Sequence, residues 1–121
     1  MLAGQTDAVG DSPLAVKQRT NVETSMYGLI GSFTAQPGKA GELAALMSAV
    51  VGAMPGCRSY VVARDPADSD KLWVTEVWDD EASHKASLQL PAVAATIKQA
   101  MPLIAGFGDR IITTPVGGYG I

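Results

Sequence analysis

The chain has 121 residues, 47% of them hydrophobic and 17% charged, which suits one domain with an apolar core. Its formal net charge of −3, without a Lys/Arg cluster, argues against nucleic acid as the main partner, because such proteins usually carry a basic patch. No run of about 18 apolar residues occurs, so we expect no membrane-spanning helix.

The single cysteine, Cys57, excludes an intrachain disulfide and fits a reducing compartment. Charged and polar residues, among them Asp7, Asp11 and Lys17, interrupt any apolar core that a secretory signal would need near the N-terminus. We therefore expect a cytoplasmic protein.

Residues 1–25 differ from the domain expected over residues 26–121. They are rich in Gly, Ser, Thr, Asp and Gln and show no sustained hydrophobic period. Two interpretations stay open: an extension that adds little, or an arm that docks on a neighbouring subunit through anchors such as Leu14, Val16 and Val22.

The first half of the domain predicts a strand, a helix and a second strand. An apolar run predicts a strand at 27–34, and the Pro-Gly pair at 37–38 predicts a turn. Apolar residues then recur at the spacing of one helical face, until Pro55-Gly56 ends the helix. These residues are Leu43, Leu46, Met47, Val50, Val51 and Met54. A second strand is predicted at 57–64.

The second half again predicts a strand, a helix and a strand. Residues 65–70 read as a polar loop, and residues 71–78 as the third strand. The side chain of Asp80 can cap the helix that follows, which Pro91 breaks and restarts. Helical spacing continues over Val93, Ile97, Met101 and Ile104. We expect residues 106–108 to close the helix and residues 110–115 to form the last strand.

The element order β-α-β-β-α-β predicts a ferredoxin-like α+β fold with an antiparallel sheet. Both faces of the third strand are apolar: Trp73, Thr75 and Val77 point one way, and Leu72, Val74 and Trp78 point the other. A sheet with one solvated face alternates apolar and polar residues. The face that the helices leave bare therefore needs a cover, and a second copy in a symmetric homodimer is the simplest one.

Several short motifs follow one another in a fixed order. They are Pro37-Gly38-Lys39, Pro55-Gly56-Cys57, Arg64-Asp65-Pro66 and Glu76-Val77-Trp78, followed by Leu88 and Pro91. In this order and spacing, residues 27–115 resemble the antibiotic biosynthesis monooxygenase family of dimeric α+β barrels, including its quinol monooxygenases. The resemblance implies oxygenases that use no metal and no organic cofactor, and that oxidise phenols, anthrones or quinols with molecular oxygen.

The resemblance directs attention to His84, the only histidine. In some family oxygenases a tyrosine near the substrate stands six residues after the strand tryptophan, and His84 holds that place here. It is the candidate general base, or hydrogen-bond partner of the substrate oxygen, because an imidazole titrates near neutrality. A more common family pattern has histidine where this chain has Ser87, which shares a helix face with His84.

Further candidate substrate contacts are Trp78, Tyr60, Ser87 and Lys98, each with an alternative interpretation. Trp78 could stack on a flat ring or pack in the core. Tyr60 could point its hydroxyl into a cavity or pack on the sheet, and Lys98 could approach the substrate or be solvated. Glu76 needs a partner if it is buried, and we expect Arg58 or Arg64, or the other subunit, to provide it.

Other types of site are not expected. One histidine and one cysteine cannot make a zinc site with the usual ligand spacing, and residues 93–98 lack the axial histidine of haem-degrading relatives. The leading hypothesis is a cofactor-free monooxygenase acting on a small aromatic substrate with oxygen. The alternatives are a non-catalytic dimer of the same fold that binds a small apolar metabolite, and an isomerase.

Overall fold

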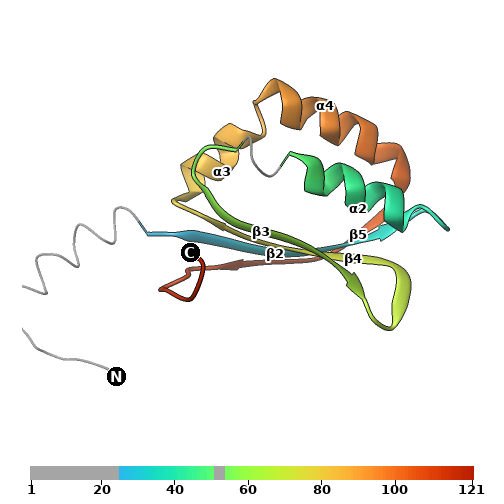
Figure 1. Ribbon diagram of the computed structural model, residues 1–121, viewed down its shortest axis with the longest axis horizontal. Coiled ribbons are helices and arrows are strands. Elements are labelled where there is room, and N and C mark those ends of the chain that lie inside the picture. The colour runs from blue at the N-terminus through green and yellow to red at the C-terminus, as the bar shows by residue number, and fades with distance from the viewer. Residues whose placement is uncertain (1–24, 51–53) are drawn as a thin grey trace, which may run out of the picture.

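The computed structural model describes residues 25–50 and 54–121, and four antiparallel strands form its sheet in the order β3-β4-β2-β5. Figure 1 shows the helices gathered on one side of this sheet. The strands are β2 (Tyr27–Ala35), β3 (Cys57–Asp65), β4 (Asp68–Trp78) and β5 (Ile104–Thr113). The helices are α2 (Ala40–Ala49), α3 (Glu81–Ser87), α4 (Pro91–Ala100) and the 3-10 turn η2 (Met101–Leu103).

The predicted order β-α-β-β-α-β is confirmed, with α3 and α4 as the two parts of the helix that Pro91 divides. Residues 1–24 and Val51 lie outside the described residues, so the proposed arm and its anchors stay a prediction. No helix in residues 25–50 and 54–121 has the length and apolar character needed to cross a bilayer.

The prediction for the last strand was wrong at its start. β5 begins at Ile104, because Pro102 lies in the short turn η2 and the chain then pairs with β2 from Ala35 onward. The glycines at 106 and 108 belong to this strand and do not cap a helix. The loop at 65–70 is also shorter than predicted, because β3 extends to Asp65 and β4 begins at Asp68.

A β-bulge accounts for one of these glycines. The pairing of β2 with β5 shifts between Gly31 and Phe33, and there the buried Ser32 hydroxyl accepts a hydrogen bond from the Asp109 backbone N–H at 2.8 Å. A Cβ at Gly108 would collide with the Ser32 hydroxyl. Glycine is therefore required by close approach and not by an unusual backbone angle.

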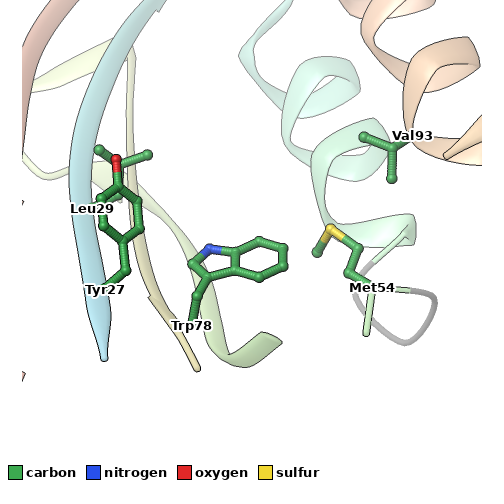
Figure 2. Packing of buried hydrophobic residues seen from close by; sticks show 5 residues of the cluster. All are labelled: Tyr27, Leu29, Met54, Trp78 and Val93. Carbon is green, nitrogen blue, oxygen red and sulfur yellow. The ribbon is translucent and has the colours of Figure 1, made fainter. Parts of the chain in front are cut away.

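The core lies between the sheet and the helices in two clusters. One surrounds Leu43 and Leu72 between α2 and β4. The other surrounds Trp78, whose indole points from the sheet toward Met54 and Val93 in the helical layer, as Figure 2 shows. The strand register places Leu29 beside Glu76 and Tyr27 beside Trp78, so this second cluster lies next to Glu76 on the covered face of β4.

We expect Leu72→Ala to lower the free energy of unfolding by about 2–5 kcal/mol, because the Leu72 side chain is fully buried and its loss leaves a cavity. Leu88→Ala is the matched control: Leu88 is 43% exposed, and its truncation should cost about 1 kcal/mol or less. Urea denaturation of the two variants measures the difference. Equal losses in both would contradict this assignment of the core.

Candidate functional site

A cavity of about 320 Å³ lies between the covered face of the sheet and the helices. Its wall is mostly apolar, with methionine and aliphatic side chains from the helices facing aromatic side chains from the strands. Leu88, Ile97, Met101 and Phe107 line it and are also exposed to solvent, so the cavity opens to bulk water beside them. Such a space suits a compact apolar ligand with few polar groups.

Glu76 places a carboxylate in this apolar wall. The two-residue period of β4 puts it on the same face as Trp78, and the Trp78 Nε1–H donates to Glu76 Oε1 at 2.9 Å. Only 13% of the Glu76 side chain is exposed. Burial raises the pKa of Glu76, against the opposing effects of the indole hydrogen bond and of the positive charge on Arg110.

Neither arginine expected as the partner of Glu76 forms an ion pair with it in the described residues, and a partner from the other subunit stays a prediction. Arg58 instead pairs with Asp79, with 2.7 Å between Nε and Oδ1. Arg64 stands opposite Leu72 in the register, whereas Tyr60 stands opposite Glu76. Within the described residues, the indole of Trp78 is the group that donates a hydrogen bond to Glu76.

His84 enters the cavity from α3. That helix begins at Glu81, after Asp80 caps it by accepting the Ser83 N–H at 2.7 Å. The imidazole lies 5.4 Å from the Tyr27 ring and 5.4 Å, edge to face, from the Trp78 ring. Burial, reinforced by the positive charge of Arg110, lowers the pKa of His84. The ring is therefore neutral at pH 7.

The His84 Nε2 and Glu76 Oε1 atoms are 3.9 Å apart. This distance is too long for a direct hydrogen bond, and a neutral imidazole makes no ion pair with the carboxylate. The two groups thus lie next to each other in the cavity lining without a direct hydrogen bond.

The structure brings most of the predicted site residues together. Trp78, Tyr60, His84 and Ser87 all line the cavity. Burial, with a further effect of the Glu76 charge, raises the pKa of Tyr60, so its phenol stays protonated at neutral pH. Ser87 is buried, and its hydroxyl donates to the His84 carbonyl oxygen at 2.6 Å. Its hydroxyl proton is therefore already engaged.

Lys98 is exposed on α4 and does not belong to the cavity lining. Thr96 does line it, and the sequence analysis did not select this residue. Its spacing from Val93 and Ala100 on one face of α4 was the available signal. No group of three or more His, Cys, Asp or Glu side chains able to hold a metal ion occurs in the described parts of the chain.

Comparisons with known proteins agree with this architecture. The family model described as antibiotic biosynthesis monooxygenase matches residues 26–99. A Chloroflexus aurantiacus structure that carries the same family name is 54% identical, with a TM-score of 0.78, over 80% of this chain and 99% of that one. No match was found among curated proteins.

More distant structures share the fold alone. One from Mycobacterium tuberculosis is 20% identical, with a TM-score of 0.66, and the match covers 78% of this chain and 99% of that chain. One from Nitrosomonas europaea, again named for antibiotic biosynthesis monooxygenase, is 11% identical with a TM-score of 0.70, over 77% of this chain and 92% of that one.

The depressed pKa of His84 makes stability depend on pH. Below its ordinary value of 6.5 the unfolded chain binds a proton that the folded chain does not. The stabilisation is therefore complete above about pH 6.5 and is lost as the pH falls through the lowered folded pKa. We expect the stability of the wild type relative to His84→Gln to decrease in that window, by at most about 1.4 kcal/mol per pH unit.

Urea denaturation at several pH values between about 5 and 8 measures this difference. Glu42→Gln, which removes an exposed carboxylate on α2, is the control and should leave the pH dependence of the wild type unchanged in this window. A difference between wild type and His84→Gln that does not vary with pH would contradict the buried, neutral imidazole.

Proposed function

The chain belongs to the antibiotic biosynthesis monooxygenase family, and from this premise we propose that it oxidises an aromatic phenol, anthrone or quinol with molecular oxygen, using no metal and no organic cofactor. One observation carries the proposal: His84 and Glu76 lie 3.9 Å apart in the lining of a mostly apolar cavity, beside the ring of Trp78. A flat apolar molecule with one hydroxyl group matches that combination of apolar wall and ionisable groups.

The proposed reaction begins with removal of a proton from the bound substrate. The electron-rich anion then gives one electron to oxygen, the radical pair recombines, and the peroxide formed collapses to a quinone and water. His84 contacts the reacting hydroxyl, either as the general base or as a hydrogen-bond donor to the developing anion. Trp78 supplies a surface for the substrate ring, and the Tyr60 hydroxyl is a further polar contact.

The other face of the sheet supports the proposal of a homodimer. Adjacent residues Val61, Thr75, Ile30 and Ile111 form a row across all four strands on the side away from the helices. Val61 is 53% and Ile111 49% exposed, and exposed apolar patches on a sheet commonly mark protein–protein contacts. We propose that a second copy covers this row. The cytoplasmic location also stays a prediction.

Oxygen uptake tests the activity. The purified protein, with a chelator present, is incubated with a panel of anthrones and hydroquinones while dissolved oxygen is recorded. We expect consumption of one oxygen molecule per quinone formed from an anthrone, and a decrease of kcat by about 10²–10⁴-fold in His84→Ala, the range typical for loss of a positioned proton-transfer group. Gln89→Ala, which changes an exposed side chain just after α3, should behave as the wild type.

Two results would replace this function by an alternative. Tight binding of these compounds without oxygen uptake would indicate a non-catalytic binding protein. Conversion of a compound without consumption of oxygen would indicate an isomerase.

Light scattering coupled to gel filtration tests the dimer. We expect twice the chain mass of 12.5 kDa for the wild type and the monomer mass for Val61→Lys and Ile111→Lys, because each substitution would bury an unpaired charge. Gln99→Lys, on the exposed surface of α4, is the control and should stay dimeric. A wild-type monomer at micromolar concentration would contradict the proposal.

A further inference from the structure

His84 Nε2 and Glu76 Oε1 lie close enough together for one hydroxyl group beside them to reach both. The Nε2 and Oε1 atoms are 3.9 Å apart, and a hydroxyl oxygen beside them can lie at about 2.7–3.0 Å from both, the usual length of a hydrogen bond. The Glu76 carboxylate is already held in place, because the Trp78 indole donates a hydrogen bond to its Oε1 atom. The Ser87 hydroxyl donates to a backbone carbonyl and does not compete as a donor.

We propose that the substrate hydroxyl binds beside Glu76 and His84 on the cavity side, within hydrogen-bond reach of both, with Glu76 as the catalytic residue that accepts its proton and His84 Nε2–H as the donor that holds the resulting oxyanion. This inference rests on the proposed function and assigns roles within its first step. The O–H bond of the substrate breaks, its proton goes to the Glu76 carboxylate, and its electron pair stays on the substrate oxygen. The proton leaves Glu76 in the water that forms when the peroxide collapses.

The number of charges buried in the cavity favours this assignment. If neutral His84 took the proton, an imidazolium and a phenolate would both be created in an apolar cavity, where each new charge is costly. If Glu76 takes it, the single negative charge that the cavity already contains moves to the substrate, and the number of buried charges does not change. The positive charge of Arg110 acts on the Glu76 site and remains available to the anion in its new position.

The burial of the two groups favours the same assignment of roles. It raises the pKa of Glu76, which makes the carboxylate a stronger base than an exposed one. It lowers the pKa of His84, which makes the imidazole a weaker base and keeps it in the neutral form that can donate from Nε2.

The other titratable groups around the pair can be named element by element. They are Tyr27 on β2, Cys57 and Tyr60 on β3, Glu81 and Lys85 on α3, and Arg110 on β5. The residues by which α2, its C-cap and α4 line the cavity do not titrate: Met47, Val50, Val93, Thr96, Ile97 and Ala100. At neutral pH, Glu76 is therefore the carboxylate that lines the cavity and can accept a proton there.

Two glutamine variants separate the roles. In Glu76→Gln the amide oxygen can still accept the Trp78 N–H, but the base is lost, and kcat should fall by about 10²–10⁴-fold. In His84→Gln the amide nitrogen can replace Nε2–H as a donor, so this variant should retain at least ten times the kcat of His84→Ala. In the profile of kcat/KM against pH, activity should decrease on the acid side with a midpoint above pH 4.5, the ordinary pKa of Glu76. This decrease should persist in His84→Gln, and its loss in that variant would overturn the assignment.

A binding measurement keeps the inference independent of oxygen chemistry. In a Trp73→Phe background, quenching of Trp78 fluorescence reports binding of 1-naphthol and of 1-methoxynaphthalene, which lacks the hydroxyl proton. We expect 1-naphthol to bind about 10- to 100-fold more tightly, as for a hydrogen bond to a charged group, and Glu76→Gln to reduce this preference, because an amide oxygen is a weaker acceptor than a carboxylate. Glu42→Gln should keep it.

The outcomes of the two measurements are distinct. A hydroxyl preference that depends on Glu76 in a protein without oxygen uptake would overturn the proposed function but support the binding of the hydroxyl by this pair. A preference of undiminished size in Glu76→Gln, with normal melting temperature and normal oxygen uptake, would overturn the inference and leave the proposed function intact.

Discussion

The site depends on one buried negative charge. β4 alternates its side chains between two faces, and this alternation places the Glu76 carboxylate among apolar groups, two residues before Trp78. A carboxylate in such surroundings is unfavourable unless a donor reaches it. The indole of Trp78 is that donor, so the same side chain that fills the core also stabilises the charge.

The position of the imidazole follows from this arrangement and from the helix that comes next. Asp79 and Asp80 end the strand, Asp80 caps α3, and the first turn of that helix returns His84 over the rings of Tyr27 and Trp78. Nine residues from Glu76 to His84 therefore contain an acid, a neutral imidazole and the aromatic surface between them. The helices α2 and α4 cover this short segment with apolar side chains and contribute no charged group to the cavity lining.

Much of this could be predicted from the sequence because it depends on local periods. The two-residue period of β4 placed Glu76 and Trp78 on one face, and the helical period grouped His84 with Ser87. The partner of Glu76 could not be predicted in this way. Arg58 and Arg64 were chosen by charge, whereas the register of β3 against β4 sets which side chains meet, and that register includes an irregularity next to Arg58. The start of β5 was missed for a related reason: Gly106 and Gly108 flank Phe107 as they would at a helix end, and pairing with β2 overrides that local signal.

The bulge at Ser32 sets which face the residues of β5 after Asp109 present. One extra residue on β5 between Phe107 and Arg110 lets both stand on the helical side, opposite Phe33 and Gly31. Beyond it, Ile111 is aligned with the bare side of the sheet and Ile112 with the covered side. The loss of the bulge would exchange these two isoleucines without any change in hydrophobicity. Arg110 would then leave the helical side, so the bulge held by the Ser32 hydroxyl and accommodated by Gly108 keeps this cation on the side of the site.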